Sequence, residues 1–182
     1  MNKRSLLILL VICCISLAAC SGKSDKVTDE YVKNMQTFSS NVEILSVSIN
    51  SIDASSETAS ADLLTYLDYM DQTFTQMASL EVPENIPDAS VLASNAATAM
   101  HDSVTLYHEV YGAEIFDGDL ELKAKARYDH AFSCVAELGK LLRNEEYIIP
   151  VDTADADLTS PDLADPASSV SEDMSVSDND PE

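Results

Sequence analysis

Apolar residues recur at alternating steps of three and four along the middle of the chain, a spacing that places them on one face of an α-helix. In the first segment with this spacing, the apolar residues are Tyr31, Met35, Phe38, Val42, Leu45, Ile49 and Ile52. In the second segment they are Leu63, Leu67, Met70, Phe74 and Met77, and Leu64 and Tyr66 widen the apolar face. The second segment ends at Pro83, because proline cannot continue a helix. The pattern therefore predicts two amphipathic helices before Pro83.

Two further segments show the same period. The third carries Ala93, Ala97, Met100, Val104, Tyr107 and Tyr111, and the fourth carries Ala124, Tyr128, Ala131, Val135, Leu138 and Leu142. Pro87 and Asp88 suit the first turn of the third helix, and Gly112 suits its end. The third apolar face is richer in alanine than the others. This fits either a close approach between helices or a thin core layer filled by aromatic side chains from neighbouring helices.

The predicted fold class is all-α. Short connections favour antiparallel neighbours, so four such helices predict an up-down-up-down antiparallel four-helix bundle over residues 27–150. The remaining segment, Val151–Glu182, has ten acidic residues, no basic ones and no aromatic ones. This composition cannot bury enough apolar area to offset the entropy lost on ordering, so it predicts a disordered acidic C-terminal tail over residues 151–182.

The N-terminus has the organisation of a signal peptide. Lys3 and Arg4 precede a largely apolar run from Ser5 to Ala19. The run is 15 residues long, which is shorter than the roughly 20 residues that a transmembrane helix needs. Residues 1–19 are therefore predicted to be a cleaved signal peptide and not a permanent membrane span.

The run ends in Leu17-Ala18-Ala19-Cys20, which resembles the lipobox of bacterial lipoprotein precursors. The resemblance implies that the Cys20 thiol receives a diacylglyceryl group and that a lipoprotein signal peptidase cuts between Ala19 and Cys20. Residues 20–26 would then be the lipidated cysteine and a short tether. Each buried methylene contributes about 0.8 kcal/mol, so two acyl chains would hold the protein on its membrane.

The helical segment itself resembles the small, mostly uncharacterised helical lipoproteins of Gram-positive bacteria. That resemblance implies a lipid-anchored protein on the extracytoplasmic face of the cell membrane. For a Gram-negative host, the expected location is the outer membrane.

The charge of the chain is strongly negative. It has 32 acidic and 10 basic residues and a formal net charge of -22. A polyanion does not neutralise phosphates, so we expect no nucleic-acid partner. No Lys or Arg occurs from Asn34 to Leu122, whereas fifteen acidic residues do. This predicts an acidic surface that is either simply solvated or attracts divalent cations or a basic partner. The basic residues Lys123, Lys125 and Arg127 are expected to pair with an adjacent acidic face.

Two histidines form the first group of candidate cation ligands. His101 and His108 are seven residues apart, so they share a face of the third helix about 10.5 Å apart along its axis. Asp102 and Glu109 follow them directly. One metal ion would therefore need further ligands from another helix. The alternative is that both histidines are ordinary residues at the edge of the apolar face.

The acidic residues Asp117, Asp119 and Glu121 form the second group, because they alternate as in the first half of an EF-hand loop. However, Leu122 and Tyr128 stand where that loop requires its glycine and its bidentate glutamate. An N-cap role for Asp117 or Asp119 explains the same residues more simply. No Glu-x-x-His or Cys-x-x-Cys-His motif is present. We predict no metal site and no cofactor.

Several tyrosines lie on or beside the predicted apolar faces. They are Tyr66, Tyr69, Tyr107, Tyr111 and Tyr128. Two interpretations remain open, tyrosines at the edge of the core or a tyrosine-lined cleft for a sugar or peptide. Cys134 lies in an apolar stretch and is interpreted as a small buried hydrophobic residue. No nucleophile signature such as G-x-S-x-G occurs, so no enzymatic activity and no catalytic residue is predicted.

These observations predict a membrane-anchored, non-enzymatic binding or interaction module at the cell envelope. Its expected partners are the membrane, through the lipid on Cys20, and an envelope protein or peptide. The alternative is a lipoprotein that binds a small ligand or a divalent cation. That ligand would bind at His101 and His108, or at Asp117, Asp119 and Glu121.

Overall fold

The computed structural model describes residues 26–152. It contains four α-helices and, within these residues, no strand: α2 (Lys26–Asn50), α3 (Ala59–Ala78), α4 (Asp88–Gly112) and α5 (Gly118–Leu142). The predicted all-α fold with four helices is therefore confirmed. The residues of the predicted signal peptide, of the predicted lipobox at Leu17–Cys20 and of nearly all of the predicted acidic tail lie outside the described residues.

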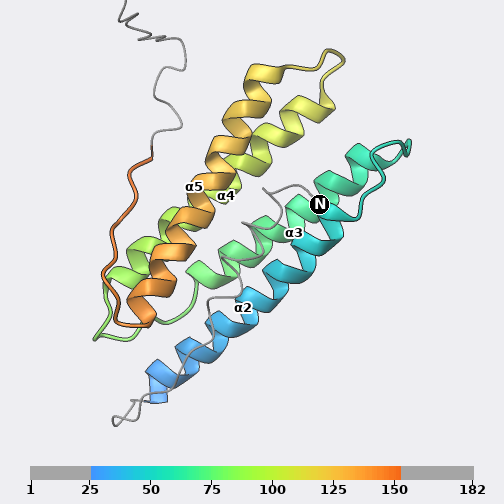
Figure 1. Ribbon diagram of the computed structural model, residues 1–182. Coiled ribbons are helices and arrows are strands. Elements are labelled where there is room, and N and C mark those ends of the chain that lie inside the picture. The colour runs from blue at the N-terminus through green and yellow to red at the C-terminus, as the bar shows by residue number, and fades with distance from the viewer. Residues whose placement is uncertain (1–25, 153–182) are drawn as a thin grey trace, which may run out of the picture.

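Consecutive helices run in opposite directions, as Figure 1 shows. Each helix packs on the next one in the sequence, and the contact between α4 and α5 is the most extensive. The helices α2 and α3 thus form one hairpin, and α4 and α5 form a second. The turns of both hairpins lie at the end of the molecule opposite the start of α2 (Figure 1).

The residues at the helix ends explain where α4 and α5 begin. Asp88 is the first residue of α4, in the first turn as the sequence predicts, and Pro87 is the N-cap directly before it. The N-cap of α5 is Asp117, whose side chain accepts hydrogen bonds from the backbone N–H groups of Asp119 and Leu120, both at 3.0 Å. These bonds satisfy two of the N–H groups that every helix start leaves without an intrahelical partner.

The core is built from side chains of all four helices. Its centre is Phe74 of α3, which is fully buried. The Phe74 ring packs edge-on against Phe38 of α2 at 5.1 Å and against Phe132 of α5 at 5.5 Å, between ring centroids. Edge-to-face aromatic pairs stabilise a core beyond the area they bury. These rings therefore join the α2–α3 hairpin to the α4–α5 hairpin.

The predicted apolar faces of α2 and α3 are largely the buried ones, although they open toward one end. Tyr31, Met35, Phe38 and Val42 of α2 are buried, and so are Leu67, Met70, Phe74 and Met77 of α3. Towards the hairpin turn, Leu45, Ile49 and Leu63 are only partly buried against the core. The core is therefore less tightly closed at the end that carries the two hairpin turns.

Helix α4 is buried more extensively than its predicted face. The buried residues of α4 that lie off this face are Ala89, Leu92, Ala96, Ala99, Ser103 and Val110. The physical reason is that α4 packs on both α3 and α5, so it needs two apolar faces. The Ser103 hydroxyl donates a hydrogen bond of 2.8 Å to the backbone carbonyl of Ala124 in α5. The alanines of α4 therefore accompany a close approach to α5, the first of the two alternatives left open by the sequence.

After α5 the chain turns back and runs along the helices (Figure 1). Asn144 makes this turn with φ of 56°, a conformation that asparagine tolerates better than most residues. The backbone N–H of Ile148 then donates to the buried carboxylate of Glu137 at 3.0 Å. Asp152, which was assigned to the predicted tail, pairs with Arg127. The described chain thus includes a segment after the last helix, residues 145–152, which we call the return segment.

Candidate functional site

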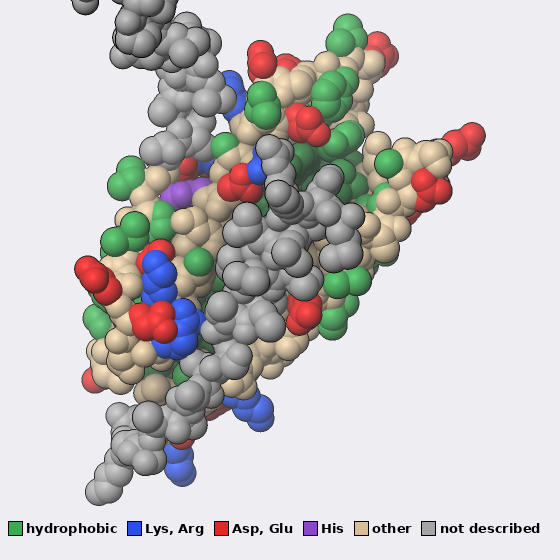
Figure 2. All heavy atoms as spheres, in the orientation of Figure 1, with side chains coloured by type: hydrophobic (Ala, Val, Ile, Leu, Met, Phe, Trp, Pro, Cys, Tyr) green, Lys and Arg blue, Asp and Glu red, His purple; other side chains and the backbone are tan. Residues whose placement is uncertain are grey.

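A cavity of about 270 Å³ lies near the hairpin turns, where the core is incompletely closed. All four helices line it. The lining residues are Ser46, Ile49, Asn50, Leu63, Leu67, Tyr107, Tyr111, Glu121, Lys125, Tyr128 and Asp129. Its volume is just below the roughly 300–1,000 Å³ that is usual for small-molecule sites. The two hairpin ends diverge at this end of the molecule, and apolar side chains lie between them (Figure 2).

Tyrosine rings from α4 and α5 form one wall of the cavity. Tyr107 and Tyr111 are stacked, with their centroids 6.2 Å apart and their planes 19° from parallel. Tyr128 packs on Phe132 at 4.7 Å, which ties its ring to the core. The sequence left open a tyrosine-lined cleft, and three of the five tyrosines it singled out line this cavity. Tyr66 and Tyr69 do not contribute to its lining.

Burial raises the pKa of these phenols further above physiological pH. Desolvation, with smaller contributions from Glu121, Tyr111 and Asp129, raises the pKa of Tyr107 to about 12. Desolvation also raises the pKa of Tyr128 and Tyr111. The rings therefore remain neutral at physiological pH and offer aromatic surface and hydroxyl groups, but no negative charge.

The charged residues of the cavity come from the first turns of α5. Glu121 accepts a hydrogen bond of 3.0 Å from the Tyr111 hydroxyl. Lys125 forms an ion pair with Asp129, one helical turn further along. These three groups carry a formal charge of minus one, because one ammonium faces two carboxylates. The cavity therefore has an apolar floor, an aromatic wall and a negatively charged edge.

Ser46 supplies a polar group on the opposite side, from α2. Its hydroxyl oxygen is buried and, within residues 26–152, has no hydrogen-bond partner. An unpaired buried hydroxyl costs free energy unless another group completes it. A ligand with a polar atom near Ser46 would remove that cost.

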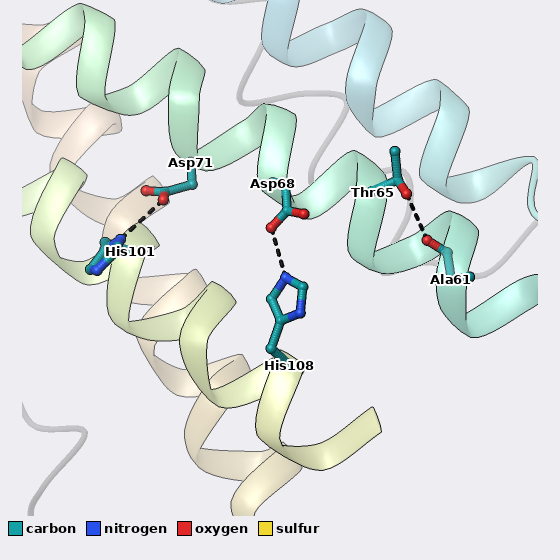
Figure 3. Close-up of polar contacts among 6 residues, drawn as sticks. All are labelled: Ala61, Thr65, Asp68, Asp71, His101 and His108. Atoms are coloured by element: carbon teal, nitrogen blue, oxygen red, sulfur yellow. Dashed lines mark hydrogen bonds and ion pairs between the residues drawn. The ribbon is translucent and has the colours of Figure 1, made fainter. Parts of the chain in front are cut away.

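The two candidate histidines do not converge on one site. Each faces a separate aspartate of α3 across the α3–α4 interface, as Figure 3 shows. Nδ1 of His101 lies 3.0 Å from Oδ2 of Asp71, and Nε2 of His108 lies 2.7 Å from Oδ1 of Asp68. The hydroxyl of neighbouring Thr65 donates to the carbonyl of Ala61 in its own helix. The histidines thus act as two separate links between helices.

The acidic residues at the start of α5 also do not act together at one site. Asp117 caps the helix, whereas Glu121 bonds to Tyr111 and belongs to the cavity. In the described part of the chain, no three His, Cys, Asp or Glu side chains are grouped so that they could hold a metal ion. The two backbone N–H groups that bond to the Asp117 side chain confirm its interpretation as an N-cap.

Cys134 is fully buried and forms no disulfide. Burial, chiefly, raises the pKa of its thiol to about 11. Its sulfur lies 3.7 Å from Nε2 of His130, one turn earlier on α5. A buried thiol with a raised pKa is protonated at neutral pH and therefore a poor nucleophile, which confirms the interpretation of Cys134 as a buried, apolar residue.

The predicted pairing of the basic cluster is found in part. Arg127 lies 4.0 Å from Asp102 of α4 and also contacts Asp152 of the return segment. Lys125 pairs within its own helix instead. The helix turn between Lys125 and Asp129 explains this difference, because residues four apart are neighbours on a helix surface.

Several residues of the cavity and of the histidine contacts could not be selected from the sequence. Ser46 and Asn50 are ordinary polar residues beside the apolar face of α2, and Asp68 and Asp71 are two among many carboxylates. The spacing of Asp68 and Asp71, three residues apart, does place them on one face of α3. Only the packing of α3 on α4 brings that face to the histidines.

These features define a small all-helical protein with a tyrosine-lined cavity at one end. Comparison of the chain with protein-family models, with curated proteins and with solved structures gave no match. Among the described helices, none is long and apolar enough to cross a membrane.

Proposed function

We propose that this chain is a lipid-anchored, non-enzymatic binding protein on the extracytoplasmic face of a bacterial membrane, with the tyrosine-lined cavity as its binding site. The observation that carries the binding function is the cavity itself, which four antiparallel helices of one bundle would share. The Leu17–Cys20 lipobox supports the anchor.

The position of the cavity is consistent with this function. It is lined by Ile49 and Asn50 at the far end of α2, whereas the proposed lipid on Cys20 precedes Lys26 at the start of that helix. A helix rises 1.5 Å per residue, so the two ends of α2 are about 37 Å apart. A bundle standing on its tether would therefore present the cavity to the exterior, away from the bilayer.

The composition of the cavity favours a small molecule over a protein or a metal ion. Its volume of about 270 Å³ is close to the lower limit of small-molecule sites, and its lining combines apolar side chains with a few polar groups, as such sites do. The candidate cation ligands His101 and His108 are bonded to separate aspartates of α3. Asp117 is occupied as the N-cap of α5. A small ligand is thus the form of the binding function that the geometry supports best.

The anchor is tested by a pair of cysteine variants of the full chain expressed in a bacterial host. Cys20→Ser should leave the precursor uncut and without lipid, whereas Cys134→Ser, at a buried site, should be processed normally. Membrane fractionation and intact mass report both properties. Normal processing of Cys20→Ser would contradict the lipobox interpretation.

The binding function is tested with neohexanol, a neutral alcohol with a compact apolar body. We expect it to shift the NMR signals of the tyrosine rings in the full chain. Ser46→Leu should abolish the shift because leucine fills part of the cavity. Ser40→Leu, at an exposed position of the same helix, should retain it. Absence of any shift, or equal shifts in both variants, would refute binding in the cavity.

A further inference from the structure

We infer that the cavity between the hairpin ends selects a small organic cation, an alkylammonium or quaternary ammonium ion with a compact apolar body. This inference rests on the proposed binding function and adds the chemical class of the ligand. It is carried by the charge and the aromatic lining of the cavity together.

The first argument is the sign of the electrostatic field in the cavity. Glu121 and Asp129 outnumber Lys125 among the charged lining residues, and Lys125 is already paired with Asp129. The surrounding helices strengthen the imbalance, because no Lys or Arg occurs from Asn34 to Leu122. Clefts lined mainly by one sign of charge concentrate ions of the opposite sign. An anion would enter the cavity against this field, and a cation would enter with it.

The second argument is the aromatic wall. A cation within about 6 Å of a tyrosine ring is attracted by the negative face of its π system. Tyr107, Tyr111 and Tyr128 form one wall of a space of only about 270 Å³, so a cation inside would lie close to at least one of these rings. Aromatic walls bind weakly hydrated organic cations better than strongly hydrated metal ions, since less hydration is lost.

The third argument concerns the remaining polar groups. The carboxylate of Glu121 accepts one hydrogen bond from Tyr111, but a carboxylate offers about four acceptor positions. The Ser46 hydroxyl is buried without a partner. The apolar floor of Ile49, Leu63 and Leu67 would receive the alkyl part of the ligand. A molecule with an ammonium group, an apolar body and one polar end would satisfy each of these surfaces.

Three probes of nearly equal shape separate charge from fit. Choline is the cation, and neohexanol is its neutral carbon isostere. The anion is tert-butylacetate, the carboxylate of tert-butylacetic acid. We expect the full chain to bind choline about three- to thirtyfold more tightly than neohexanol, measured by titration calorimetry at low salt. Tert-butylacetate should bind more weakly than neohexanol. Equal affinities for choline and neohexanol would overturn this inference, yet would leave the cavity as a binding site for neutral molecules.

Matched variants locate the effect in the cavity. Tyr107→Leu should remove most of the preference for choline, and Tyr107→Phe should keep it because the ring remains. Glu121→Gln should lower the choline affinity severalfold without affecting neohexanol. Two control variants change the same residue types outside the cavity, Tyr69→Leu and Glu109→Gln, and should behave as the wild type. If Glu109→Gln weakens choline binding as much as Glu121→Gln does, the cation is held by the general acidic surface and the inference fails.

Discussion

At the residue scale, each histidine of α4 has its own aspartate. The His101 side chain is 68% exposed and its partner Asp71 is 22% exposed. The hydrogen bond with Asp71 and the charge of Asp71, with a smaller contribution from Asp102, raise the pKa of His101. Because the pKa is raised in the folded state, the pair contributes stability below the ordinary histidine pKa of about 6.5. That stability is lost as the pH rises through the raised pKa that His101 has in the folded protein.

The pair can be tested by titration. Asp71→Asn should lower the pKa of His101 toward its ordinary value, because the amide carries no charge. Solvent screening limits the stability lost at low pH to less than about 1 kcal/mol. NMR of the His101 ring during a pH titration measures the shift. Asp68→Asn is the control, since Asp68 faces His108, and an equal effect of both variants on His101 would contradict the assigned pairing.

Glu137 is a second residue whose role depends on its contacts. Desolvation acts to raise its pKa, but hydrogen bonds from Lys140 and from the N–H of Ile148 outweigh it, so the pKa of Glu137 is lowered. The carboxylate therefore stabilises the fold above the ordinary glutamate pKa of about 4.3, and this contribution is lost as the pH falls through the lower folded value. The negative charge holds the return segment against α5.

Replacement of this carboxylate should destabilise the protein. We expect Glu137→Ala to cost about 1–3 kcal/mol at neutral pH, because it removes an acceptor from a part-buried backbone N–H and from Lys140. Urea unfolding at neutral pH and at pH values below about 4 measures the cost, which should shrink under acidic conditions. Glu146→Ala, at an exposed site, should change little. A cost that stays constant with pH would argue against a role for the charge.

At the element scale, α4 is the helix that packs between α3 and α5. It is buried on the face toward α3 and on the face toward α5, and small residues let it approach α5 closely. Ala93, Ala96 and Ala99 are each at most 2% exposed. Such positions leave no space for a longer side chain, because protein interiors are close-packed.

Enlarging one of these alanines should therefore strain the α4 interfaces. We expect Ala96→Leu to destabilise the protein by about 1–3 kcal/mol, the usual cost of overpacking. Ser94→Leu places the same side chain at an exposed position of α4 and should be neutral or slightly stabilising, since leucine favours helices more than serine. Thermal unfolding compares the two. Equal stability of the variants would mean that α4 has room at its buried face.

At the scale of the whole molecule, the return segment closes one side of the bundle. Tyr147 packs against the core and donates a hydrogen bond to Asp88 at the start of α4. Ile148 bonds to Glu137, and Asp152 pairs with Arg127. The segment thus contacts α4 and α5 together, although it contains no helix or strand.

Two truncations separate this segment from the acidic tail. Ending the chain after Asn144 should lower the stability by about 1–3 kcal/mol, because it exposes apolar surface and leaves Glu137 without one of its donors. Ending it after Asp152 should hardly change the melting temperature, as the composition of residues 153–182 predicts. Calorimetry of both proteins gives the comparison. A large loss in the longer protein would show that the tail contributes to the fold.

The amino-acid sequence by itself determined the number and type of the helices. The step of three and four residues follows directly from 3.6 residues per turn, and Pro87 and Asp117 mark helix starts through local chemistry that needs no tertiary contact. For the same reason the tyrosines of α4 and α5 could be recognised as candidates for a cleft, and Cys134 as a buried residue.

Only the tertiary structure decided which residues meet. The two apolar faces of α4, the partners of His101 and His108, and the acceptor role of Glu137 all depend on how far one helix is shifted and rotated against another. A periodic pattern describes one helix at a time and contains no information on that offset. The cavity lined by Ser46, Tyr107 and Glu121 likewise exists because the ends of α2 and α4 lie beside the start of α5. That arrangement is a property of the packing and not of any single segment.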